Sequence, residues 1–159
     1  MDLLILILQG VIVAATPLVF AAIGELVVER AGVLNLGIEG MMILGAIAGF
    51  SVTLDSGSYL AGIIAAAAAG AVAAFLFGVL TQVLMANQVA TGLALTIFGL
   101  GLSALWGQGY SGESTVPLAK IHIPLLSDIP IIGPLLFSHD PLVYLSIILV
   151  SGVAWFLAK

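Results

Sequence analysis

The stretch LLILILQGVIVAATPLVFAAI, residues 3–23, contains no charged side chain. A bilayer core of about 30 Å requires about 20 helical residues, so this stretch is long enough to cross a membrane once. Its N-terminal flank is the acidic Asp2 without Lys or Arg, which favours a retained helix over a cleaved signal peptide. Pro17 predicts a kink, and Thr16 or a neighbouring helix is expected to satisfy the carbonyl that it frees.

Four further apolar segments follow the first one along the chain. They cover residues 32–54, 59–85, 89–106 and 142–158. We therefore predict an all-α fold, a polytopic transmembrane helix bundle of about five spanning helices, one of them discontinuous. Residues 1–159 are expected to form a single transmembrane domain with an outer loop over residues 107–141.

The composition agrees with a surface that faces mostly lipid. Hydrophobic residues make up 62% of the chain and charged residues 7%, with a mean hydropathy of +1.33. Soluble domains carry about 25% charged residues, so the usual polar shell is missing here. The net charge of −5 is scattered over isolated residues, and no basic patch predicts nucleic-acid binding. The chain has no cysteine, which excludes disulfides.

The three basic residues predict an orientation. Arg30 and Lys159 are separated by four spans and share one side, while Lys120 falls on the other. The positive-inside rule then places Arg30 and Lys159 in the cytoplasm and the loop over residues 107–141 outside. Prolines within residues 121–137 prevent one continuous helix, so we expect short turns or a short helix on the outer surface. Such a segment either docks a partner or is a plain ordered loop.

Small residues predict close helix packing in two segments. Residues 65–78 consist largely of alanine and glycine, which lets other helices approach the backbone. Gly45 and Gly49 form a GxxxG pattern in the preceding segment with the same meaning.

Glu39 is the most informative polar residue, because a charge in a spanning segment is costly unless it faces a cavity or a partner. Asn35 lies four residues earlier, on the same face of a continuous helix. Glycines at membrane depth interrupt helices in transporters, and here they surround Glu39. The candidate helix break is formed by Gly32, Gly37 and Gly40. Glu39 and Asn35 either line a translocation pathway or bond to a neighbouring helix and lock the bundle.

Asn87, Gln88 and Thr91 open the fourth segment. Asn or Thr caps exposed backbone amides at a helix start, which is the structural interpretation. If this face turns inward, the three residues instead flank the inner mouth of a pathway for a polar, uncharged solute. With Asn35 and Glu39 they complete the candidate pathway residues.

Three stretches together resemble a known family. They are ERAGVLNLGIEGMM at residues 29–42, NQVATGLA at 87–94 and IPLLSDIP at 123–130. With the Thr16–Pro17 pair, they resemble inner-membrane permeases of the simple-sugar and nucleoside group of ABC importers over essentially the whole chain. Branched-chain amino-acid permeases share the architecture but differ in the motif around Asn35.

The resemblance implies a set of partners and a location. Such permeases pair with a second permease subunit, two cytoplasmic ATPase subunits and an extracytoplasmic substrate-binding protein in the prokaryotic cytoplasmic membrane. Nucleoside is the first expected solute and simple sugar the second. Family members continue into a basic loop that contacts the ATPase and into further helices, so we expect this chain to be the N-terminal part of such a subunit.

The chain is not expected to be an enzyme or to bind a cofactor. A P-loop needs a lysine followed by Ser or Thr, and neither Lys120 nor Lys159 fits, so ATP would be used by partner subunits. His122 and His139 are too isolated to predict a metal site.

Three alternatives from other classes stay open at this stage. One is a secondary transporter or channel that uses Glu39 as a proton relay. Another is a non-transporting structural membrane fragment. The third is an intramembrane serine protease, because Gly109-Tyr110-Ser111-Gly112 matches a GxSG pattern, although its histidine base would have to come from loop residues.

Overall fold

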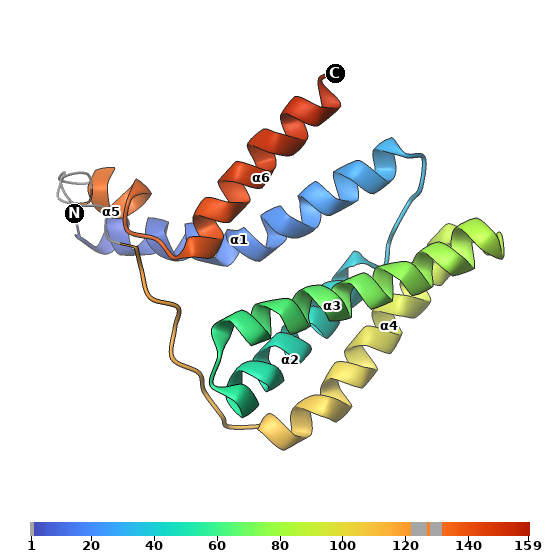
Figure 1. The fold of residues 1–159 in the computed structure, drawn as a ribbon, viewed down its shortest axis with the longest axis horizontal. Coiled ribbons are helices and arrows are strands. Elements are labelled where there is room, and N and C mark those ends of the chain that lie inside the picture. The colour runs from blue at the N-terminus through green and yellow to red at the C-terminus, as the bar shows by residue number, and fades with distance from the viewer. Residues whose placement is uncertain (1, 122–126, 128–131) are drawn as a thin grey trace. The chain divides into compact units, whose positions relative to one another are not determined.

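The computed structural model describes residues 2–121, 127 and 132–159, and every regular element in these ranges is a helix (Figure 1). The prediction of an all-α helical membrane bundle is confirmed for this part of the chain. The elements are α1 (Asp2–Arg30), α2 (Ile38–Ser56), α3 (Tyr59–Gly78), the π-helix η1 (Val79–Val83), α4 (Gln88–Gly107), the 3₁₀ turn η2 (Gln108–Tyr110), α5 (Ile132–Leu136) and α6 (Pro141–Leu157). They divide into two compact units, Met1–Val27 with Pro117–Lys159 and Val28–Val116, each described by itself.

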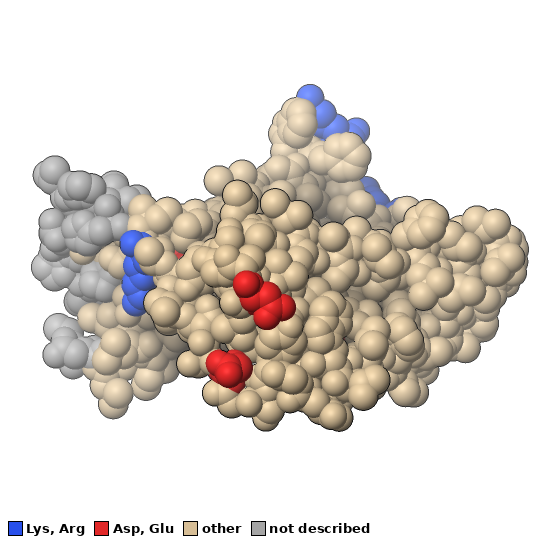
Figure 2. Space-filling model, turned by 60° about the horizontal axis from the view of Figure 1, so that its bottom comes forward, with Lys and Arg blue, Asp and Glu red and all other residues tan. Residues whose placement is uncertain are grey.

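Four helices in the described ranges are long and apolar enough to cross a membrane. They run over Leu3–Arg30, Ile38–Ser56, Tyr59–Val83 and Gln88–Tyr110. The expected fifth span corresponds to α6, which at 17 residues is shorter than these four. In the view of Figure 2, charged side chains occupy only small, separate areas of a surface that is otherwise uncharged.

The structure shifts two expected helix boundaries. The first helix continues to Arg30 rather than ending near Ile23. The second begins at Ile38, six residues later than the expected start at Gly32. Pro17 lies inside α1, and the Thr16 hydroxyl donates 2.9 Å to the Ile12 carbonyl oxygen. Pro17 has no amide hydrogen, so the carbonyl oxygen of Val13, four residues earlier, lacks its usual helical donor. The Thr16 hydroxyl donates to a different carbonyl, that of Ile12, and so does not replace this donor.

The second unit is built on α2, which packs against both α3 and α4 (Figure 1). The predicted role of the Gly45–Gly49 pair in close packing is confirmed. A methyl group on Gly49 would stand 3.1 Å from the Gly62 carbonyl oxygen and 3.0 Å from the Ala66 Cβ. A methyl group on Gly45 would stand 3.2 Å from the Ala66 carbonyl oxygen. The backbones of α2 and α3 therefore lie almost in contact, as small residues permit.

In the first unit, His139 organises the segment before α6. Its side chain is 2% exposed, and Nε2 lies 2.7 Å from the Leu135 carbonyl oxygen. The Ile121 amide donates to the His139 carbonyl oxygen at 2.9 Å, and the Ser127 hydroxyl donates to the Phe137 carbonyl oxygen at 2.6 Å. His139 is thus a buried structural residue, which its position in an expected loop did not indicate. The short helix expected in this region is α5, while residues 122–126 and 128–131 lie outside the described residues.

Asp140 caps the start of α6. Its Oδ1 accepts from the Leu142 amide at 2.9 Å and from the Val143 amide at 3.1 Å, and Pro141 occupies the first helical position. Asp140→Ala is expected to lower the free energy of unfolding by about 1 kcal/mol, because both amides lose their acceptor. Asp140→Asn keeps an acceptor oxygen and should stay close to the original protein. Thermal unfolding in detergent compares the two variants, and equal losses in both would contradict a capping role.

Candidate functional site

The end of α1 is closed by a Schellman motif at Gly32. The Gly32 amide donates to the Glu29 carbonyl oxygen at 2.9 Å, and the Val33 amide donates to the Val28 carbonyl oxygen at 3.2 Å. Gly32 has a φ of 84°, the left-handed conformation that glycine adopts without strain. Gly32 therefore stops α1 and turns the chain into the segment of residues 33–37.

Side chains, rather than helical backbone hydrogen bonds, pair with backbone amides and a carbonyl of residues 33–37. The Leu34 amide donates to Gln88 Oε1 at 2.8 Å. The Gly37 amide donates to Asn35 Oδ1 at 2.9 Å, which is an Asx turn. The Thr96 hydroxyl donates to the Leu36 carbonyl oxygen at 3.1 Å. These bonds compete with helix formation, so the regular helix resumes only at Ile38.

The predicted polar stripe of Asn35 and Glu39 is wrong in one respect. Asn35 precedes α2, so the two side chains are not separated by one helical turn. Asn35 is 5% exposed, and its Nδ2 lies 3.6 Å from the Met41 sulfur. The pattern in the sequence is compatible with a helix through Asn35, but the hydrogen bonds with Gly37 and the turn at Gly32 prevent it.

The start of α2 lies beside the middle of α4. A methyl group on Gly40 would stand 2.6 Å from the Leu95 carbonyl oxygen and 2.7 Å from the Thr96 Cα. A methyl group on Gly99 would stand 2.7 Å from the Gly40 carbonyl oxygen. Because α4 covers Gln88–Gly107, residues 95–99 lie at its centre. Gly40 therefore does not break a helix. Its missing side chain allows the first turn of α2 to pack against the backbone in the middle of α4.

Glu39 lies in the first turn of α2 and is exposed. The carboxylate is near the N-terminal end of the helix, where the helix dipole favours negative charge. Ala46 lies two turns further along α2 and is also exposed, so Glu39 belongs to a face of α2 that neither α3 nor α4 covers. Glu39 therefore lies at the start of α2, beside the middle of α4, and not in the middle of one continuous helix over residues 32–54.

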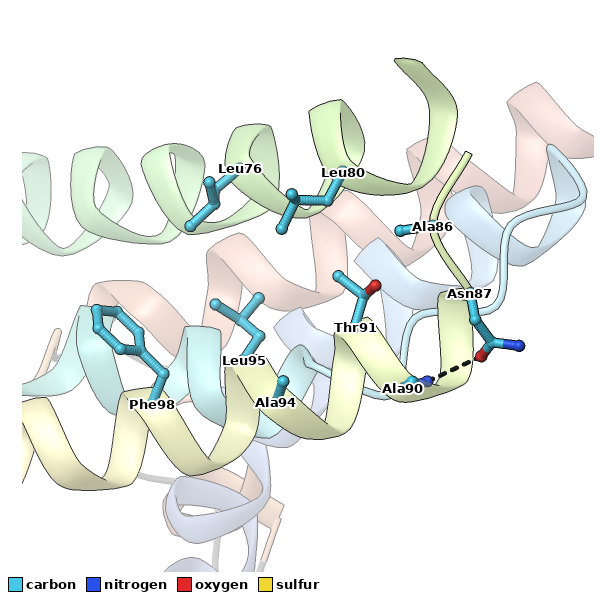
Figure 3. A pocket seen from close by; sticks show the side chains of 9 residues that line it. All are labelled: Leu76, Leu80, Ala86, Asn87, Ala90, Thr91, Ala94, Leu95 and Phe98. Atoms are coloured by element: carbon cyan, nitrogen blue, oxygen red, sulfur yellow. Dashed lines mark hydrogen bonds between the residues drawn. The ribbon is translucent and has the colours of Figure 1, made fainter. Parts of the chain in front are cut away.

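Asn87 and Thr91 line a cavity between the end of α3 and the start of α4 (Figure 3). The cavity has a volume of about 470 Å³. Asn87 Oδ1 accepts from the Ala90 amide at 3.0 Å, so the predicted capping role of Asn87 is confirmed. Figure 3 shows Thr91 projecting from α4 toward the α3 side, while the rest of the lining is apolar. It consists of Leu76, Leu80, Ala86, Ala90, Ala94, Leu95 and Phe98.

The candidate pathway residues therefore divide into two groups. Gln88 bonds to residues 33–37, whereas Thr91 lines the cavity. Three positions along a helix turn the side chain by about 300°, so the two side chains point only about 60° apart and lie on adjoining faces of α4. Gly92 and Thr96 also contact residues 33–37, and Gly99 contacts Gly40; these three residues were not predicted from the sequence. Their spacing from Gln88, at four, eight and eleven residues, places all of them toward one face of a helix, which is the signal that was available.

Residue groups for other chemistries do not form in the described part of the chain. No cluster of three or more His, Asp or Glu residues suited to a metal ion occurs among the described residues. Ser111 follows the 3₁₀ turn η2 in the second unit, while His139 lies in the first unit and His122 is outside the described residues. The third resembling stretch, residues 123–130, lies outside the described residues except for Ser127.

Four described helices long and apolar enough to cross a membrane are the pattern of a multi-pass membrane protein. A family model described as branched-chain amino acid transport system / permease component matches residues 7–159. The chain belongs to this family of permease components.

Three curated relatives are similar over nearly the whole chain. A protein of Haloferax volcanii named as a glucose ABC transporter permease is 39% identical and aligns with 96% of this chain and 48% of its own length. A guanosine ABC transporter permease of Bacillus subtilis is 30% identical, with 98% of this chain and 52% of the relative aligned. A nucleoside ABC transporter permease of Lactococcus lactis subsp. cremoris is 28% identical, with 95% and 51% aligned.

The chain spans about half the length of the three curated relatives that it matches. No solved structure matches the chain with significance.

Proposed function

We propose that this chain forms the membrane-spanning N-terminal part of a permease subunit in an ATP-driven importer. The importer would carry a small polar solute across the prokaryotic cytoplasmic membrane, with nucleoside as the first candidate and simple sugar as the second. Support comes from the family, from guanosine and nucleoside permeases among the relatives, and from a glucose permease as the most identical of the three.

The importer requires partners that hydrolyse ATP and deliver the solute. A second permease subunit would complete the pathway, and cytoplasmic ATPase subunits would supply the energy. An extracytoplasmic substrate-binding protein would bring the solute to the outer side. The chain itself would bind no cofactor, and ATP would be used only through the partner ATPases.

The position of Glu39 carries the proposal for the pathway. A carboxylate that is exposed in the first turn of α2, beside the middle of α4, requires a polar surrounding in the membrane. A water-filled pathway along the uncovered face of α2 would supply it. The backbone interruption before α2 fits the same assignment, because irregular backbone at membrane depth occurs where it is buried in protein or lines a cavity. Asn35 and Gln88 would then support the interruption, while Asn87 and Thr91 would lie away from this face.

Glu39→Gln in the full-length permease is expected to lower solute uptake about tenfold while assembly with the partner subunits is unchanged, because the charged group of the pathway is lost. Uptake of labelled nucleoside and of labelled glucose by cells that express the whole importer measures the effect. Ala46→Ser, on the same face of α2, is a matched control that should keep uptake close to the original value.

Uptake by Glu39→Gln equal to that of the original protein would remove Glu39 from the pathway. Loss of the variant from the membrane would instead favour the interpretation in which Glu39 locks the bundle. The same assay without the ATPase subunits tests a secondary transporter or channel, since uptake that persists without them would exclude an ATP-driven importer.

A further inference from the structure

The segment of residues 33–37 has two long-range hydrogen bonds to α4, one near each end. Gln88 accepts from the Leu34 amide across 54 positions of sequence, and Thr96 donates to the Leu36 carbonyl oxygen across 60. Between them, a methyl group on Gly92 would stand 2.8 Å from the Leu36 amide nitrogen. The segment therefore lies directly along the first half of α4.

We propose that Gln88 and Thr96 are positioning residues, which hold residues 33–37 out of the helix and thereby fix Glu39 beside the middle of α4. This inference rests on the proposed function for the role of Glu39. Neither residue needs to touch a solute; each acts through a backbone group of the segment. Gln88 thereby leaves the group of residues that would contact the solute.

A specific competing state explains why such residues are needed. The sequence from Gly32 to Leu54 is apolar enough for a continuous helix, and in that helix Asn35 and Glu39 share a face. The Leu36 carbonyl oxygen would then find a donor within the helix, which is the ordinary way to satisfy backbone groups away from water. The Thr96 hydroxyl supplies the alternative donor, and Gln88 supplies an acceptor for the Leu34 amide. The two side chains thus favour the interrupted form over the continuous helix.

The two forms place Glu39 at different depths. Four residues span at most about 13 Å when extended and about 6 Å when helical, and the Asx turn at Asn35 shortens the observed segment, so its conversion would shift α2 by at most about 7 Å relative to α4. Such a displacement is large compared with the bilayer core of about 30 Å. The position of residue 39 along the membrane normal therefore reports which form is present.

Residues 1–159 contain no cysteine, so a cysteine introduced here is the only one in this part of the permease. Any cysteine in the rest of the full-length permease is first replaced by serine, so that a spin label reports on one site. The label is placed at position 39 by Glu39→Cys in the full-length permease in lipid vesicles, and its depth is measured from collisions with oxygen and with a water-soluble nickel chelate. Ile97→Cys, an exposed position 72% accessible on α4, is the reference that should not move.

Matched substitutions separate positioning from general packing. Thr96→Val keeps the shape but removes the donor, and Thr96→Ser keeps the donor. Gln88→Leu removes the acceptor, and Gln88→Glu keeps one. We expect Thr96→Val and Gln88→Leu each to move the label at position 39 by on the order of 5 Å relative to Ile97→Cys, while the Ser and Glu variants keep the original depth.

An unchanged depth of the label in both Thr96→Val and Gln88→Leu would overturn the proposal. Depth shifts in Thr96→Ser and Gln88→Glu as large as those in Thr96→Val and Gln88→Leu would overturn it as well. If one of the two fails to fold, the other still tests its own end of the segment. A depth shift combined with normal uptake by Glu39→Gln would keep the positioning role and remove the pathway role. The two proposals therefore fail separately.

Discussion

Gly40→Ala is expected to lower the free energy of unfolding by about 3 kcal/mol, the largest loss from any single methyl group on the α2–α4 contact. The added Cβ would stand 2.6 Å from the Leu95 carbonyl oxygen, 2.7 Å from the Thr96 Cα and 3.0 Å from the Leu95 carbonyl carbon. All three are backbone atoms of α4, so no flexible side chain can move aside. The two helices must separate, which also breaks the contacts around Gly99.

Gly101→Ala is the matched control for Gly40→Ala. Gly101 lies within α4, and a Cβ there would meet no atom within 4 Å outside its own helix. Alanine favours helix over glycine by about 1 kcal/mol, so this variant should be neutral or slightly more stable. Reversible unfolding in mixed detergent, followed by circular dichroism, measures both. Similar losses for the two variants would show that α2 and α4 are not in backbone contact at Gly40.

Gly62→Ala is expected to have the second largest effect, a loss of about 2–3 kcal/mol, because it overpacks the α2–α3 contact. The added Cβ would overlap Thr53 Oγ1 and stand 2.8 Å from the Gly49 carbonyl oxygen. The Thr53 hydroxyl donates to that same carbonyl oxygen at 2.7 Å, so a rotation of Thr53 would also break this bond. The same unfolding measurement applies.

Two further variants locate the origin of the Gly62→Ala loss. Thr53→Ala removes the nearer obstacle, so the double variant should recover part of the loss but not all of it, since the Gly49 carbonyl oxygen stays in place. Gly70→Ala, in the same helix α3 with no atom within 4 Å of the added Cβ, should not destabilise the protein. Full recovery in the double variant would mean that the backbones of α2 and α3 are further apart than the structure places them.

The existence of the spanning helices was predictable from hydropathy, because a spanning helix must contain a long apolar run whatever its neighbours are. The starts of α3 and α4 lie within one residue of the predicted starts. The packing role of Gly45 and Gly49 was also predictable, since only small residues allow two backbones to approach in lipid. Motifs in the sequence likewise indicated the permease family.

The exact start of α2 was not predictable. The glycines marked a candidate break, but residues 32–37 carry no charge and their hydropathy is also compatible with a helix. Three side chains that bond the segment decide it, and two of them, Gln88 and Thr96, are more than 50 residues away in the sequence. The different partners of Gln88 and Thr91, on adjoining faces of α4, have the same origin, since periodicity gives relative directions on a helix but not which face meets a neighbour.

The sequence by itself determined that this protein resides in the membrane, because the balance of apolar and charged residues is a property of composition and needs no partner. Only the tertiary structure decided where the helix carrying Glu39 begins. The physical reason is that backbone amides and carbonyls accept whichever hydrogen-bonding partner lies nearest in space, and for residues 33–37 two of those partners come from α4.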